Sequence, residues 1–109
     1  MMVLFSEDFI SDLSDIESIY RDLLFLPESG KKIISEIMNV CDSIGQFPEM
    51  GIDLESKFGY GKPYRYVIYR NYLLFYEIDH NDVMMLRLLD GRVDYMRVLF
   101  GNDHQDSSD

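Results

Sequence analysis

The sequence predicts an α+β fold, with an N-terminal strand and a helical hairpin packed on an antiparallel β-meander and a short C-terminal helix. Apolar residues recur at helical spacing over the first 44 positions, and tyrosine-rich segments separated by short turns follow residue 63. The 109 residues, 47% of them hydrophobic, suit one domain with a real core. We expect this domain to occupy residues 1–100 and residues 101–109 to form a disordered acidic tail.

The first half of the chain is predicted to form a strand and two helices. Residues 3–5 are a candidate strand, and Ser6 is a good N-cap for a helix over about Ser6–Phe25. A second helix is expected over Glu28–Ile44, with Gly45 as its C-terminal cap. The short connection between the two helices predicts an antiparallel hairpin.

The acidic side chains of the first helix lie largely between its apolar positions. Glu7 and Asp8 favour the first turn, and the pair Asp12 and Asp15 follows. Since charged residues usually remain in water, we expect both acidic pairs to form the solvated face of this helix.

Three strand-like segments follow a loop over residues 52–61. They are Pro63–Arg70, Tyr72–Ile78 and Val83–Leu89, and short turns rich in Asn and Asp join them into a meander. Residues 93–100 are expected to form a short helix.

Alternation along these strands predicts which side chains share a face of the sheet. Tyr64, Tyr66 and Ile68 fall on one face of the first meander strand. The same alternation places a second set on one face of the last strand, namely Val83, Met85, Arg87 and Leu89. Because the two helices cover only one side of the sheet, we expect an open second side that could hold a ligand, a nucleotide or a peptide.

The formal net charge of −10 is unevenly distributed. Residues 1–56 carry twelve acidic and three basic side chains, whereas residues 57–97 carry five acidic and seven basic ones. This pattern is not that of a general nucleic-acid binder, so we expect no direct DNA binding by this chain alone.

The sequence offers little for metal, cofactor or nucleophilic chemistry. Cys41 lies on the apolar stripe of the second helix and is expected to be a buried thiol. His80 and His104 lack the partners of a metal site or a catalytic triad, so we expect neither a metal nor a cofactor. A single cysteine and the lack of a membrane-length apolar stretch favour a cytoplasmic protein with no membrane association.

Five arginines lie in or beside the predicted sheet: Arg65, Arg70, Arg87, Arg92 and Arg97. One interpretation is that they are ordinary solvated residues that balance nearby acids. The other is a recognition surface for phosphate or for an acidic partner segment.

Three segments, taken in order, resemble the RelE/ParE superfamily of bacterial type II toxins: Phe47–Gly51, Asn71–Ile78 and Val83–Tyr95. The resemblance extends from Phe5 to about Leu99. It implies a strand, a helical hairpin and an antiparallel sheet. It also implies a cognate antitoxin, encoded beside the toxin, that wraps and neutralises it, in systems associated with growth inhibition and plasmid stabilization.

The superfamily has two branches with different targets. Its RelE branch cleaves mRNA on the ribosome, and its ParE branch poisons DNA gyrase without being an enzyme. RNA-cleaving members use basic side chains and a terminal Tyr or His, and Leu73 stands at the position of one such base. The acidic net charge also opposes ribosome binding. The resemblance therefore favours the ParE-like branch.

Three functional hypotheses follow from the resemblance. The favoured one is a gyrase-binding toxin whose target-binding residues are Arg87, Arg92, Tyr95 and Arg97. The second is a ribosome-dependent mRNA endoribonuclease that uses Arg65, Arg87 and Arg92 on phosphate and Tyr95 for proton transfer. The third is a degenerate toxin fold that acts only as a binding module. In each case the antitoxin is expected to be less acidic than usual, and to cover the apolar groove along the helices or add a strand to a sheet edge.

Overall fold

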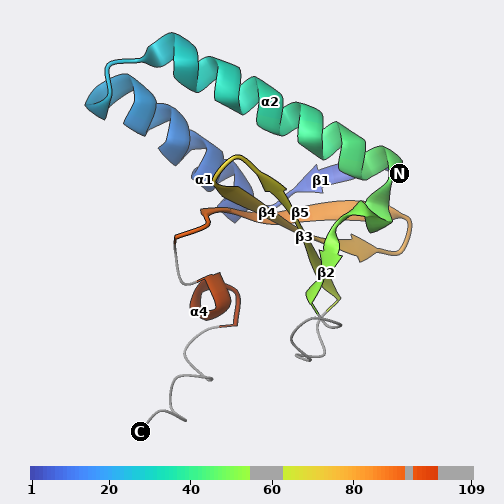
Figure 1. The fold of residues 1–109 in the computed structure, drawn as a ribbon. Coiled ribbons are helices and arrows are strands. Elements are labelled where there is room, and N and C mark those ends of the chain that lie inside the picture. The colour runs from blue at the N-terminus through green and yellow to red at the C-terminus, as the bar shows by residue number, and fades with distance from the viewer. Residues whose placement is uncertain (55–62, 93–94, 101–109) are drawn as a thin grey trace, which may run out of the picture.

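The computed structural model describes residues 1–54, 63–92 and 95–100 and confirms the α+β class (Figure 1). The elements are β1 (Val3–Phe5), α1 (Glu7–Ser18), η1 (Ile19–Leu23), α2 (Pro27–Gln46), η2 (Pro48–Met50), β2 (Ile52–Asp53), β3 (Tyr64–Tyr69), β4 (Tyr72–Asp79), β5 (Asp82–Asp90) and α4 (Tyr95–Phe100). Residues 101–109, the predicted tail, lie outside the described residues.

The five strands form one sheet in the order β1-β5-β4-β3-β2. The meander β3-β4-β5 is antiparallel as predicted, while β1 pairs parallel to β5, with Val3 opposite Val83. Residues 52–53 were expected in a loop but form β2, which pairs with β3 through Ile52 and Tyr66. The sequence did not predict this strand, because two residues are too few to show an alternation of apolar and polar side chains.

The two helices form the predicted hairpin, but the first one changes from an α-helix to a π-helix before the turn. The Ser6 side chain caps α1 by accepting a hydrogen bond from the Phe9 amide at 3.0 Å. From Ile19 to Leu23 the chain is π-helical, and the Leu24 amide donates to the Ile19 carbonyl five residues back. Phe25 then turns the chain at a positive φ of 56°. No helix among the described residues is long and apolar enough to cross a membrane.

Gly45 is not the cap of the second helix, which corrects the prediction. It lies inside α2, which continues to Gln46, and it is buried. A Cβ atom at this position would lie 2.7 Å from Cγ2 of Val3. The glycine therefore allows α2 to approach β1 closely rather than ending the helix.

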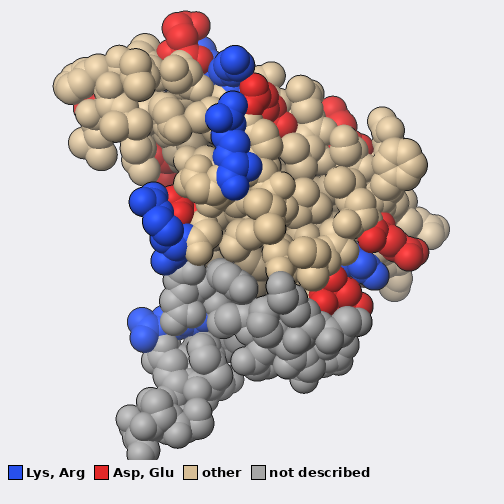
Figure 2. Space-filling model, in the orientation of Figure 1, with Lys and Arg blue, Asp and Glu red and all other residues tan. Residues whose placement is uncertain are grey.

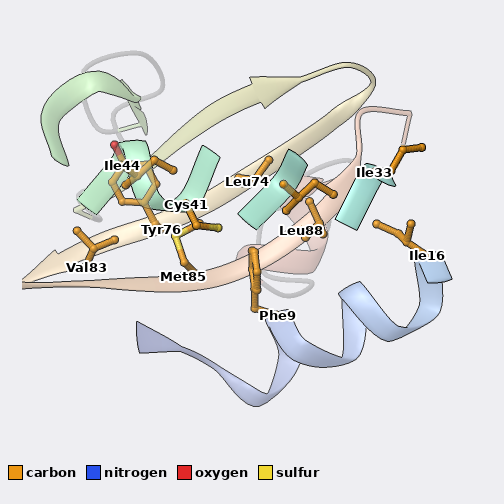
Figure 3. Close-up of a cluster of buried hydrophobic side chains, with 11 residues drawn as sticks. Phe9, Ile16, Ile33, Cys41, Ile44, Leu74, Tyr76, Val83, Met85 and Leu88 are labelled. Atoms are coloured by element: carbon orange, nitrogen blue, oxygen red, sulfur yellow. The ribbon is translucent and has the colours of Figure 1, made fainter. Parts of the chain in front are cut away.

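The main core lies between the helical hairpin and the sheet (Figure 3). We call it the helix-side cluster. Its fully buried members include Phe9 of α1, Ile37 of α2 and Tyr76 of β4. Cys41 is also buried here, as predicted, and burial raises the pKa of its thiol to about 12. Such a thiol stays protonated and unreactive at neutral pH.

The second side of the sheet is not open, so that prediction was wrong. The side chains on that side are buried in what we call the second-face cluster, namely Leu54, Tyr66, Leu73, Phe75 and Leu89. Tyr64 of β3 and Leu99 of α4 pack against this cluster. The sheet is thus apolar on both sides, which leaves its edges and the seams beside the helices as places for function.

Candidate functional site: the seam between α1 and β5

Arg87 of β5 lies at the seam where α1 meets the sheet, and it is bound to Asp12 of α1. Its Nε and Nη2 atoms donate to the two carboxylate oxygens of Asp12 at 2.8 and 3.0 Å. The Leu88 amide donates to the same carboxylate at 2.8 Å. Asp12 is only 9% exposed, so the expectation that it belongs to the solvated face of the helix is wrong. At this edge of β5, the carboxylate accepts the backbone hydrogen bond from Leu88 that a neighbouring strand would otherwise accept.

A β-bulge in the β4–β5 pairing lies immediately before Arg87. Phe75 pairs with Arg87 while Tyr76 pairs with Met85, so Leu86 is an extra residue in β5. Beyond the bulge the faces exchange: Met85 packs in the helix-side cluster and Leu89 in the second-face cluster. The prediction that Met85, Arg87 and Leu89 share one face is therefore wrong.

The Asp12 carboxylate dominates the electrostatics of Arg87. The hydrogen bond to Asp12 raises the pKa of the guanidinium, with smaller contributions from the charges of Asp12, Asp8 and Asp15. Arg87 thus remains charged and is held in place by an acid of its own chain.

A cavity of about 190 Å³ lies beside Arg87 on the second side of the sheet. It is lined by Ser6, Asp8, Tyr64, Leu86, Arg87, Val98 and Leu99. A guanidinium, a phenol and a carboxylate therefore meet in one small space beneath α4.

Arg92 lies just beyond β5 and is bound to Asp90. Its Nε and Nη2 atoms donate to the carboxylate at 3.0 and 2.7 Å, and its amide donates at 2.9 Å. Asn71 adds a further hydrogen bond to Asp90 at 3.0 Å. The hydrogen bonds from Arg92 hold the pKa of Asp90 well below its usual range. The Arg92 side chain is nevertheless 86% exposed.

Arg65 lies at the other end of the sheet. Its Nη1 atom donates to the backbone carbonyls of Gly51 and Glu49 at 3.0 and 3.4 Å. In the register, Arg65 is opposite Tyr76, whereas Tyr72, four residues earlier in β4, is opposite Asp90. The structure therefore separates Arg65 from Arg92 instead of gathering them around one phosphate.

The remaining predicted site residues lie on α4. Tyr95 begins this helix, and its side chain lies outside the described residues. Arg97 is exposed and interacts within the chain. Arg70, the fifth arginine, is paired with Glu36 of α2 at 3.3 Å, and it directly precedes Asn71, which bonds Asp90.

Comparisons with known proteins agree with this architecture. The sequence profile described as the ParE toxin of the type II toxin-antitoxin system parDE matches residues 3–95, most of the chain. The chain belongs to the ParE toxin family. A solved structure described as the chromosomal ParDE toxin-antitoxin system from P. aeruginosa has the same fold, with a TM-score of 0.69 and 18% identity. The match covers 83% of this chain and 95% of that one. No curated protein matches the sequence.

Membership of the ParE family confirms the resemblance on which the sequence interpretation depended. Leu73, which the resemblance placed at the position of a base of RNA-cleaving members, is 8% exposed within the second-face cluster. In this ParE-family chain the position is therefore part of the apolar core.

Sequence reasoning missed Asp12, the residue that fixes Arg87. The signal was present, because Asp12 lies three residues after Phe9 and four before Ile16, and both are buried on one face of α1. A carboxylate on the buried face of a helix needs a hydrogen-bonding partner, but the sequence did not indicate which residue that partner is.

Metal chemistry has no visible basis in the described part of the chain, where no group of three or more His, Cys, Asp or Glu side chains could hold an ion. His80 lies in the β4–β5 turn with a side chain that is 94% exposed. His104 lies outside the described residues.

Proposed function

We propose that this ParE-family chain is a cytoplasmic toxin that stops growth by binding DNA gyrase, and that a cognate antitoxin neutralises it. The supporting observation is that the arginines are hydrogen-bonded within the chain. Arg65, Arg87 and Arg92 are each bonded within the chain and spread along the sheet, so they do not converge on a position for a scissile phosphate. Binding through an exposed surface suits this geometry better than catalysis.

The proposed target contact lies at the end of the sheet from which β5 exits. Arg92 and Arg97 expose their side chains there, Tyr95 begins α4, and Arg87 lies behind them in the seam. Arginine and tyrosine are the residue types most often found at the energetic centre of protein interfaces. Arg92 is already oriented by Asp90, so it loses little side-chain freedom on binding.

Purified protein is expected to inhibit DNA supercoiling by gyrase or to stabilise its cleavage complex. Arg92→Ala and Arg97→Ala should raise the concentration needed for half-inhibition by about tenfold, as expected for interface hot spots. Lys32→Ala, an exposed cation on α2, is the matched control and should leave inhibition unchanged. Gyrase that is unaffected at micromolar toxin would reject this target.

A second candidate function is ribosome-dependent mRNA cleavage. The specific observation in its favour is that Arg87 and Tyr64 line the same cavity, so a group that can bind phosphate and a group that can transfer a proton share one space. Primer extension on mRNA from cells that express the chain tests it. Codon-aligned cuts that disappear in Tyr64→Phe would favour this candidate over gyrase binding.

A further inference from the structure

The end of the helical hairpin carries four consecutive apolar residues, and all four are exposed. We call Leu23, Leu24, Phe25 and Leu26 the hairpin tip. Leu23 and Phe25 are 70% and 79% exposed, and Leu24 and Leu26 are half-exposed. The tip projects beyond the sheet in Figure 1, and in Figure 2 the upper left of the molecule is largely free of charged side chains. An exposed apolar run of this length marks a surface that another molecule covers.

The backbone holds the hairpin tip in a fixed shape. The Leu24 amide donates to the Ile19 carbonyl at 3.0 Å, and the Leu26 amide donates to the Tyr20 carbonyl at 2.7 Å. Just behind the tip the two helices are in close contact, because a Cβ atom at Gly30 would lie 2.8 Å from Cβ of Tyr20. A tip that is already ordered loses little backbone freedom when a second molecule covers it.

Phe25 is a costly residue for this turn. Its φ of 56° lies in the left-handed region, which suits glycine or asparagine and which a bulky side chain rarely adopts. The turn itself therefore does not require phenylalanine, and at 79% exposure the ring contributes little to the core of its own chain. A strained position that carries an exposed aromatic ring points to a role for that ring in contact with another molecule.

The hairpin tip is electrically neutral, although the chain carries a net charge of −10. The charged residues between positions 21 and 31 are two acids and two bases. They form two ion pairs within the chain, Arg21 with Asp22 at 2.9 Å and Lys31 with Glu28 at 3.5 Å. Lipid-binding helices place cations that are free for the headgroups beside their apolar side chains, and a partner steered by charge needs a charge of one sign. A neutral rim suits neither of them.

We propose that the hairpin tip is a self-association surface, at which two copies of this chain pack their helical hairpins side by side. In a twofold contact the same surface lies on both sides, so any net charge would face a like charge. The tip is the part of this acidic chain where that repulsion is absent. Because a standard interface uses roughly 20 residues or more from each partner, contact through the tip alone predicts a weak dimer with a micromolar Kd. Self-association of this kind requires neither gyrase nor an antitoxin.

Sedimentation equilibrium of the purified full-length chain tests the proposal. The average mass should rise from that of a monomer towards that of a dimer over the micromolar range. Phe25→Asn removes the ring and retains a residue that tolerates the left-handed turn, so Kd should rise by about tenfold or more. The urea midpoint of this variant in dilute solution should equal or exceed that of wild type. Leu23→Ser should weaken the dimer in the same direction.

Two matched controls remove exposed apolar side chains elsewhere. Ile10 of α1 and Ile68 of β3 are 55% and 59% exposed and lie outside the hairpin tip. Ile10→Ser and Ile68→Ser should therefore associate like wild type. Added salt should leave the dimer unchanged or strengthen it, because the contact is apolar and screening reduces the repulsion between two acidic molecules.

Each alternative occupant of the hairpin tip predicts a different result. A chain that stays monomeric at high micromolar concentration, or a dimer that Phe25→Asn and Leu23→Ser leave intact, would overturn the proposal. A dimer that Ile68→Ser abolishes would assign the contact to the sheet, and one that salt dissociates would be ionic; both results reject the tip. A monomeric chain that sediments with phosphatidylcholine–phosphatidylglycerol vesicles, and loses this property in Phe25→Asn, would assign the tip to a lipid surface instead.

Discussion

Arg87 and Arg92 hold aspartates with the same two nitrogen atoms and at nearly the same distances, but in different surroundings. The Arg87 and Asp12 side chains are 27% and 10% exposed, whereas those of Arg92 and Asp90 are 86% and 25% exposed. The first pair joins a helix to a strand 75 positions away, and the second spans two residues at a turn. The same two-point hydrogen bonding therefore connects α1 to β5 at Arg87, whereas at Arg92 it orients an exposed cation.

Removal of the buried carboxylate should have the largest effect. Asp12→Ala leaves the Arg87 guanidinium and the Leu88 amide without their partner, and we expect a loss of about 3 kcal/mol in the free energy of unfolding. Urea denaturation measures it. Asp15→Ala, an exposed acid one turn along the same helix, should change stability by less than about 0.5 kcal/mol. Equal losses in the free energy of unfolding for the two substitutions would show that the Arg87–Asp12 pair does not stabilise the fold.

Conversion of each arginine to lysine sharpens the comparison. Lysine keeps the charge but cannot form a planar fork, so Arg87→Lys should cost about 1–2 kcal/mol. Arg92→Lys should leave the urea midpoint unchanged, because the exposed pair is surrounded by water. A midpoint that falls by the same amount in both variants would contradict the distinction between the two pairs.

The smallest expected effect is the acid response of Asp90. Its pKa is lowered in the folded state, whereas an unfolded chain protonates this group near about pH 4. The ionised carboxylate therefore stabilises the fold above about pH 4, and this contribution is lost as the pH falls through the lower folded pKa. Asp90→Asn should be slightly less stable than wild type at pH 7, and the difference should vanish in strong acid. A difference that is independent of pH would have another origin.

The sequence was sufficient for the elements that depend on periodicity. The helices α1 and α2 and the strands β3 and β4 form where the spacing of their residues placed them. The prediction from sequence failed at positions where a single residue determines the local structure. Leu86 as an extra residue in β5 exchanges the faces of the strand, and nothing in its local sequence requires a bulge. Asp12 was missed because an acid on a helix is usually solvated, and its partner lies 75 positions away.

The site was predictable only in part for the same reason. The arginines were recognisable by type, but whether each one is free for a partner depends on tertiary contacts. Arg87 has an acid from α1, Arg65 has backbone carbonyls from the η2 turn, and Arg92 has a neighbour two residues away. Only the last of these contacts is local enough to be suspected from the sequence.

The parallel pairing of β1 with β5 has a consequence for the order in which the protein is made. Val3 is synthesised early, yet its partner Val83 emerges from the ribosome only after the hairpin and most of the sheet. A nascent chain therefore cannot close its sheet until nearly the whole domain has been translated, and non-local closure of this kind slows folding. Premature termination before β5 would leave the first strand without its neighbour and α1 without Arg87. Truncated products should then be cleared by proteolysis rather than persist as partly active toxin.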